Sequence, residues 1–144
     1  MLRAAKDAAR QTAAQEGCAV PLVVAVTVLT SLDDRALSEL GVNARAPAHV
    51  ETLARLAQKA GLDGVVASPQ EAASLRRDCG RDFVIVTPGI RSGGAEEPRD
   101  DQRRTLTARD AIAAGASYVV VGRPVTGAPD PRAAAEKIAA EASA

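Results

Sequence analysis

The sequence predicts an α/β fold of four parallel strand and helix units, half the number found in an eight-stranded barrel. Four short apolar runs rich in valine lack polar alternation, which is typical of parallel strands that are covered on both faces. A helical pattern follows each run, and glycine, proline or a capping residue marks most boundaries. Strands that alternate with helices form parallel units joined by right-handed crossovers.

The first strand is preceded by a helix that Gly17 is placed to end. Its apolar residues recur at helical spacing: Leu2, Ala5, Ala9 and Ala13. The run PLVVAVTVL, residues 21–29, is the first predicted strand. Ser31 is then expected to start a short helix that ends at Gly41 and has Asp34 at its third position.

The second unit follows a longer helix, predicted from about Pro47 to Gly61. One side of this helix is apolar: Val50, Leu53, Leu56, Ala57 and Ala60. The run LDGVVAS, residues 62–68, is the second predicted strand. Ser68 is expected to cap the next helix, with a proline at the first helical position and Glu71 closing a capping box.

The last two units have the same organisation. FVIVT, residues 83–87, is the third predicted strand, and a long polar loop follows it to Arg104. Thr107 is expected to cap the next helix, SYVVVG at 117–122 to form the fourth strand, and Asp130 to start the final helix.

A sheet of only four parallel strands leaves two edges unpaired. Residues 1–144 are expected to form a single partial barrel domain. The half-barrel therefore predicts either an incomplete chain or one that needs a partner.

Composition argues against several classes of protein. Lysine plus arginine equals aspartate plus glutamate at 18 each, and aromatic residues make up 1% of the chain, so neither nucleic acid nor a membrane surface is an expected partner. His49 is the only histidine and no metal site is expected. Cys18 and Cys79 lack CxxC spacing and are expected to be free thiols. With no long apolar run and no signal-peptide pattern, we expect a cytoplasmic protein.

Polar residues gather where the predicted strands end, the edge at which parallel βα proteins bind ligands. Thr30 follows the first strand and Arg91 the third, and Gly122 and Arg123 end the fourth. A glycine N–H can approach an anion closely, and the planar guanidinium of arginine matches phosphate oxygens. These residues predict a phosphate site.

Four motifs, in this order and spacing, resemble the C-terminal half of orotidine 5′-phosphate decarboxylase: VTVLTSL, GLDGVVAS, VTPGIR followed by DQRR, and GASYVVVGRPVT. The resemblance covers essentially the whole chain. It implies the last four strands of a TIM (β/α)8 barrel, preceded by one helix. It also implies conversion of orotidine 5′-monophosphate to uridine 5′-monophosphate and carbon dioxide in pyrimidine synthesis, without a cofactor.

The resemblance also implies roles for five residues. Arg91, Gln102, Gly122 and Arg123 would hold the substrate phosphate, and Thr30 would lie near the pyrimidine. Residues 92–101 would fold over the bound nucleotide and exclude water.

The family's catalytic motif, D-x-K-x-x-D, has no counterpart in this sequence. No catalytic residue is therefore assigned, because phosphate contacts cannot carry out the proton transfer that the family's lysine performs. The chain alone is expected to bind substrate poorly and to turn over negligibly. It is expected to work as a homodimer or together with the missing half of the barrel.

Two other functions stay open. Related barrels include sugar-phosphate decarboxylases and isomerases, which share this type of phosphate grip. A half-barrel that self-associates and binds phosphonucleotides without catalysis is the other alternative. For individual residues, Thr30 and Ser68 could simply cap helices, and either arginine could pair with an acid at the surface.

Overall fold

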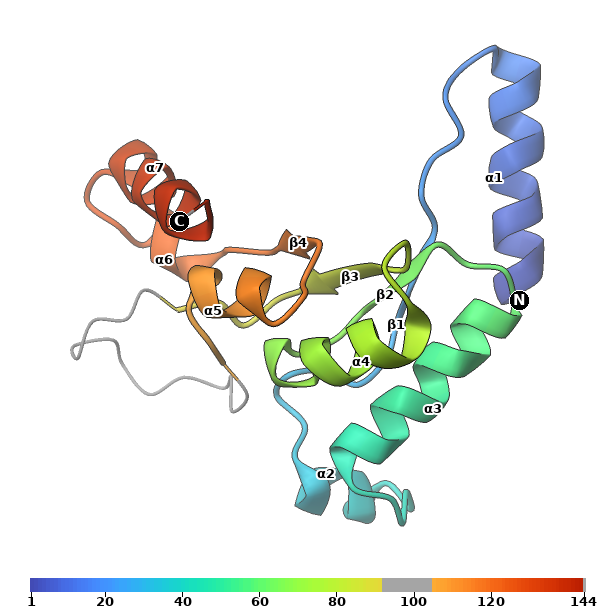
Figure 1. Cartoon of the computed structure of the whole chain (residues 1–144), viewed down its shortest axis with the longest axis horizontal. Helices are drawn as coiled ribbons and strands as arrows, with labels where there is room; N and C mark the ends of the chain where they lie inside the picture. The colour runs from blue at the N-terminus through green and yellow to red at the C-terminus, as the bar shows by residue number, and fades with distance from the viewer. Residues whose placement is uncertain (92–104, 144) are drawn as a thin grey trace.

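The computed structural model describes residues 1–91 and 105–143. Four parallel strands form one sheet in the order β1-β2-β3-β4 (Figure 1). They are β1 (Val24–Val26), β2 (Gly64–Val66), β3 (Val84–Thr87) and β4 (Tyr118–Val119). The predicted α/β class and the four predicted strands are confirmed. Each ladder is shorter than its apolar run.

Seven α-helices and one 3-10 turn are present in the described residues. The helices are α1 (Leu2–Glu16), α2 (Asp34–Glu39), α3 (Ala46–Lys59), α4 (Ala72–Cys79), α5 (Ala108–Ala113), α6 (Arg123–Thr126) and α7 (Pro131–Ala142). The 3-10 turn η1 (Pro69–Glu71) leads into α4. The short helix α6 was not expected from the sequence. The longest of the described helices is too short and too polar to cross a membrane.

Several predicted helix boundaries are confirmed by their hydrogen bonds. Gly17 ends α1 with a positive φ of 63°, a conformation that favours glycine. Ser68 accepts a hydrogen bond from the Gln70 N–H at the start of η1. Thr107 caps α5 and Asp130 caps α7 in the same way.

The start of α2 is a correction. Ser31 was expected to begin this helix, but the N-cap is Asp33, whose carboxylate accepts a 2.9 Å hydrogen bond from the Ala36 N–H. Asp34 has a different role from the one expected, because its Oδ1 accepts a 2.7 Å hydrogen bond from the Ala46 N–H. Asp34 thereby joins the start of α2 to the start of α3.

The helices cover one face of the sheet. α3 packs against β1 and β2, α4 against β3, and α5 against β4. The side chains of Val65 and Ile85 point into this helical layer and are fully buried. Within residues 1–91 and 105–143, the buried side chains form two separate apolar clusters, a larger one around α3, α4 and the first three strands, and a smaller one around α5, β4 and α7.

The opposite face of the sheet is open, which corrects the expectation that the strands are covered on both faces. One residue from each strand lies in the same row of the ladder: Val26, Val66, Val86 and Tyr118. At the two ends of this row, Val26 is 61% exposed and Tyr118 is 56% exposed. The four strands thus present an apolar surface on the side away from the helices.

Arg76 of α4 connects the two clusters. The five N–H groups of its guanidinium make six hydrogen-bond contacts of 2.7–3.1 Å, one proton being shared, to groups on two different segments. The acceptors are the carbonyls of Gly80, Arg81, Phe83 and Gly115 and the hydroxyl of Ser117. The first three lie between α4 and β3, and the other two lie between α5 and β4, so one side chain links the starts of two strands.

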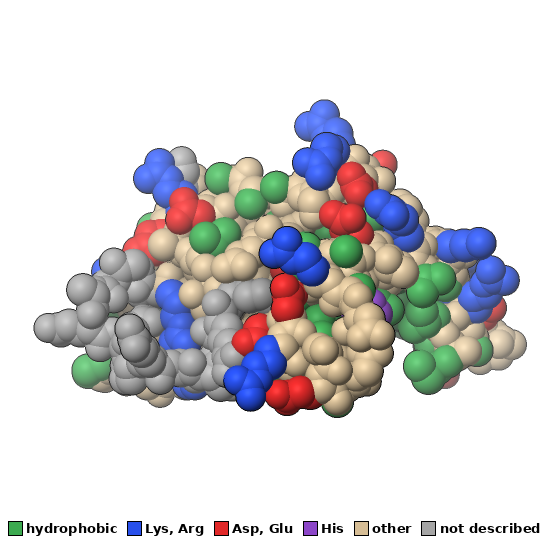
Figure 2. All heavy atoms as spheres, turned by 90° about the horizontal axis from the view of Figure 1, so that it is seen from below, with side chains coloured by type: hydrophobic (Ala, Val, Ile, Leu, Met, Phe, Trp, Pro, Cys, Tyr) green, Lys and Arg blue, Asp and Glu red, His purple; other side chains and the backbone are tan. Residues whose placement is uncertain are grey.

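Charged side chains are mixed over the surface. On the face that Figure 2 shows, basic and acidic side chains of the described residues lie interspersed, with hydrophobic side chains between them. This distribution agrees with the formal net charge of zero. The described side chains on that face therefore form no single-sign patch that would attract a polyanion.

The helix α1 is tied to the start of β2 by an ion pair between Lys6 and Asp63. The same carboxylate accepts a 2.6 Å hydrogen bond from the Val23 N–H. Desolvation raises the pKa of Asp63, but the hydrogen bonds from Lys6 and Val23, together with the Lys6 charge, outweigh it and hold the pKa below its usual value.

We expect this carboxylate to stabilise the fold above its unfolded-state pKa, about 3.9, and the contribution to be lost as pH falls through the lower folded-state pKa. Asp63→Asn should lower the free energy of unfolding by roughly 1.5–3 kcal/mol at pH 7. The difference from the wild type should shrink towards pH 2. Urea denaturation at both pH values measures this, with the exposed Asp7→Asn as control. An equal loss at both pH values would contradict the assignment.

Candidate phosphate site at the carboxyl edge of the sheet

Buried hydroxyl side chains mark the carboxyl edge of the sheet. Thr30, four residues after β1, is 5% exposed, whereas Ser68 after β2 and Thr87 at the end of β3 are fully buried. The Thr87 hydroxyl donates a 3.2 Å hydrogen bond to the Tyr118 carbonyl. Thr30 is not the N-cap of the helix that follows its strand, because Asp33 is the N-cap of α2. Ser68 is the N-cap of η1, as its alternative role required.

Arg91 lies just beyond β3. Its backbone N–H donates a 3.0 Å hydrogen bond to the Leu106 carbonyl, and the buried Ile90 forms a parallel bridge with Leu106. This bridge joins the two described ends of the long polar segment. It fixes the backbone of Arg91 at the carboxyl edge, with the side chain partly exposed.

Gly122 and Arg123 lie beyond β4. Gly122 is the N-cap of α6, and its carbonyl accepts hydrogen bonds from the Val125 and Thr126 N–H groups. Arg123 is the first residue of the helix, and both residues are exposed. A Cβ atom added at Gly122 would meet no other atom within 4 Å, so the space beside this backbone is open.

The segments that carry the two arginines leave the sheet side by side. β3 and β4 are neighbouring parallel strands, with Thr87 opposite Val119. The pairing continues past β4, where the Val120 N–H donates a 2.9 Å hydrogen bond to the Thr87 carbonyl. Arg91 and Arg123 therefore follow adjacent strands at the same edge of the sheet. Arg91 lies four residues after Thr87, and Arg123 lies four residues after its partner Val119. The remaining predicted ligand, Gln102, lies outside the described residues.

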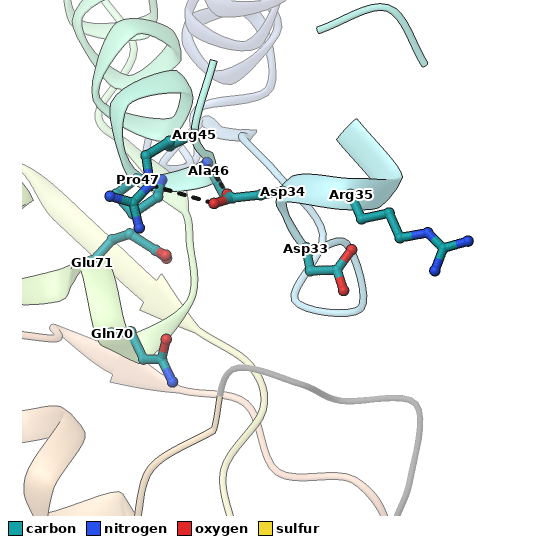
Figure 3. Close-up of a pocket in the computed structure, with 8 residues that line it drawn as sticks. All are labelled: Asp33, Asp34, Arg35, Arg45, Ala46, Pro47, Gln70 and Glu71. Atoms are coloured by element: carbon teal, nitrogen blue, oxygen red, sulfur yellow. Dashed lines mark hydrogen bonds and ion pairs between the residues drawn. The ribbon is translucent and has the colours of Figure 1, made fainter. Parts of the chain in front are cut away.

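A hollow of about 470 Å³ lies beside this edge, between the segments that follow β1 and β2 (Figure 3). It is lined by Asp33, Asp34, Arg35, Arg45, Ala46, Pro47, Gln70 and Glu71. The Asp34 carboxylate pairs with the Arg45 guanidinium at 3.4 Å across its wall. This hollow was not expected from the sequence. The sequence feature that could have indicated it is the pair of charged or amide residues after each of the two strands, Asp33–Asp34 and Gln70–Glu71.

The cysteines show no feature of a reactive site. Cys79 is buried at the end of α4, where desolvation, followed by the Asp78 charge, raises the pKa of its thiol. Cys18 is exposed, and both are free thiols. Among residues 1–91 and 105–143, no three His, Cys, Asp or Glu side chains are grouped in a way that could hold a metal ion.

Comparison with known proteins assigns the chain to a family. The sequence model of the "Orotidine 5'-phosphate decarboxylase / HUMPS family" matches residues 1–138. This chain belongs to the orotidine 5′-phosphate decarboxylase family. The resemblance carried by the four motifs is confirmed, and the family is one of lyases that break carbon–carbon bonds.

Named relatives agree with the family. The orotidine 5′-phosphate decarboxylase of Moorella thermoacetica is 54% identical over 142 residues, which are 98% of this chain and 56% of the relative. That of Neisseria gonorrhoeae is 55% identical over 118 residues, which are 82% of this chain and 48% of the relative. The chain spans about half the length of these orotidine 5′-phosphate decarboxylases.

Solved structures of the family give the same proportion. The crystal structure of the Lactobacillus acidophilus orotidine 5′-phosphate decarboxylase superposes with a TM-score of 0.82 and 39% identity, covering all of this chain and 58% of that one. The Pyrococcus horikoshii enzyme superposes with a TM-score of 0.63 and 25% identity, covering 93% and 55%. The four strands and their helices are thus about half of a family barrel.

Proposed function

We propose that this chain is the phosphate-binding half of an orotidine 5′-phosphate decarboxylase, which forms uridine 5′-monophosphate and carbon dioxide from orotidine 5′-monophosphate. The observation that carries the proposal is the pair of loops after β3 and β4. Arg91 follows one strand, and Gly122 and Arg123 follow its neighbour. The substrate is inferred from the names of the relatives, about half of whose length this chain matches.

Each residue has a chemical reason for its role. The guanidinium groups of Arg91 and Arg123 each offer two parallel N–H donors to phosphate oxygens. The open space beside Gly122 allows an anion to reach its backbone N–H. Gln102 adds an amide donor to the phosphate, and Thr30 lies near the pyrimidine.

The proton donor is not part of this half. Remote phosphate contacts supply binding energy that is used at the reacting carbon, but they do not move a proton. The lysine and aspartates of D-x-K-x-x-D belong to the other half of the barrel. The chain therefore acts with that half or as a homodimer, and we place it in the cytoplasm, where Cys18 and Cys79 stay reduced.

Uridine 5′-monophosphate should bind and protect the chain from thermal unfolding. At a hundred times its Kd the nucleotide should add about 2.7 kcal/mol to the free energy of unfolding. Arg123→Ala should weaken binding about 10- to 150-fold, because a charged hydrogen bond contributes roughly 1.5–3 kcal/mol. Isothermal titration calorimetry and thermal denaturation measure the two effects.

Two further variants separate binding from folding. Arg132→Ala removes an exposed arginine that pairs with Glu136 on α7, and it should leave affinity unchanged. Gly122→Ala should fold normally, because its new methyl group meets open space, yet bind more weakly. An Arg123→Ala protein that binds as tightly as the wild type would rule out the proposed site. Stronger protection by a keto-sugar phosphate than by uridine 5′-monophosphate would favour a related sugar-phosphate barrel.

A further inference from the structure

The exposed hydrophobic side chains are concentrated at the two edges of the sheet. Nine large hydrophobic residues in the described part of the chain are strongly exposed, and six of them lie in or beside the edge strands β1 and β4. These six are Val20, Leu22, Val26, Leu29, Tyr118 and Val120. The central strands β2 and β3 contribute none of the nine. Exposure is therefore greatest where the sheet stops, and not evenly spread over its open face.

Both edges are open to strand pairing. In the described residues β1 pairs only with β2, and β4 only with β3. Open edges with unpaired backbone N–H and C=O groups are templates for further strands. All four strands run in the same direction, so an added strand that continues a barrel must also be parallel.

The accessible surface area is large for a folded monomer. The chain exposes 8890 Å² at 14.8 kDa. A compact monomer of that mass exposes roughly 7,000 Å² by the usual scaling of area with mass. The excess is roughly 1,900 Å² for the whole chain, and a standard interface needs roughly 800 Å² of it from each partner.

We propose that two copies of this chain pair edge to edge and close one eight-stranded barrel. A two-fold axis along the barrel places β4 of each copy beside β1 of the other, with all eight strands parallel. The exposed row from Val26 to Tyr118 then lines the barrel interior in both copies. The formal net charge of zero leaves no overall electrostatic repulsion between the copies.

The position of α1 agrees with this arrangement. The helix lies beyond the β1 end of the sheet (Figure 1), and Ala13 is its only buried residue. In the closed dimer this is where the partner's β4 continues the sheet. There α1 would lie on the outer side of the seam between β1 and the partner's β4, and would continue the helical layer formed by α3, α4 and α5. The proposal concerns the sheet alone and holds whether or not the chain binds a nucleotide.

Light scattering after size exclusion should give twice the 14.8 kDa chain mass. Val26→Lys and Tyr118→Lys change the two edge strands at positions that are exposed in the single copy, so each variant should keep its helical circular dichroism. Each should raise the dimer dissociation constant at least ten-fold. Leu56→Lys, at a 54% exposed position on α3, is the matched control and should stay dimeric.

Tyr118 provides a second measurement, because the chain has one tyrosine and no tryptophan. Quenching of its fluorescence by iodide should fall as the wild-type protein is concentrated and should not fall in Val26→Lys. A wild-type monomer at high concentration would overturn the proposal. So would a dimer that Leu56→Lys disrupts and the two edge variants do not, or open-ended assembly beyond the dimer.

Discussion

Orotidine 5′-monophosphate should be decarboxylated when this chain is mixed with the half of the Moorella thermoacetica relative that it does not match. Neither piece alone should release carbon dioxide at a measurable rate. This chain carries the proposed phosphate ligands Arg91 and Arg123, and the other piece is expected to carry the proton donor. Because general acid catalysis alone contributes about 10²- to 10⁴-fold, the mixture should exceed either piece by at least that factor.

Two controls identify the source of the restored activity. The mixture made with Arg123→Ala should need a higher concentration of substrate and turn over more slowly. A partner piece with alanine in place of its D-x-K-x-x-D lysine should bind this chain and release no carbon dioxide.

Since the proposed dimer occupies the same sheet edges, activation should be faster when this chain is diluted before mixing. A stable complex of the two wild-type pieces without turnover would contradict the assignment of a competent half.

Arg76→Ala should be the most destabilising single substitution considered in this chain. It removes all six hydrogen-bond contacts of a charged donor and leaves several backbone carbonyls without that partner. A hydrogen bond from a charged group contributes roughly 1.5–3 kcal/mol, and a typical domain has only about 5–15 kcal/mol in total. Urea denaturation followed by circular dichroism measures the change.

The neighbouring arginine is the natural control. Arg77→Ala removes an exposed side chain whose charge lies 3.4 Å from Asp78, and it should change the free energy of unfolding by less than about 1 kcal/mol. Arg76→Lys should recover little, because one ammonium group cannot reach the carbonyls of both segments. A loss below about 1 kcal/mol in Arg76→Ala would mean that the network is not a connection between the clusters.

The presence and order of most helices and strands could be predicted from the sequence. The residues at which they begin and end were the least predictable. The apolar run 21–29 predicts a strand, but the ladder covers only Val24–Val26, which is as short as its partner β2 (Gly64–Val66). The choice between Ser31 and Asp33 as N-cap depends on the direction in which the chain leaves the sheet. The helix α6 has four residues, too few for a periodic pattern, and its only local signal was Pro124.

Features that depend on distant residues were not predictable. The sequence has adjacent arginines at 76 and 77, and nothing local distinguishes the one whose partners include Gly115 and Ser117, about 40 positions away. The site residues were proposed from motifs at strand ends, and the adjacency of β3 and β4 required the sheet order. The pairing of Lys6 with Asp63 likewise needed the packing of α1.

The division of the interior into two apolar clusters has a consequence for cooperativity. Thr30 follows a strand of the larger cluster, whereas Arg123 belongs to the segment around the smaller one. A sub-global opening of the smaller unit would release Arg123 and leave the surroundings of Thr30 folded. A nucleotide that contacts both units would connect two foldons through its own covalent bonds, and its binding would make the unfolding of the chain more nearly all-or-none.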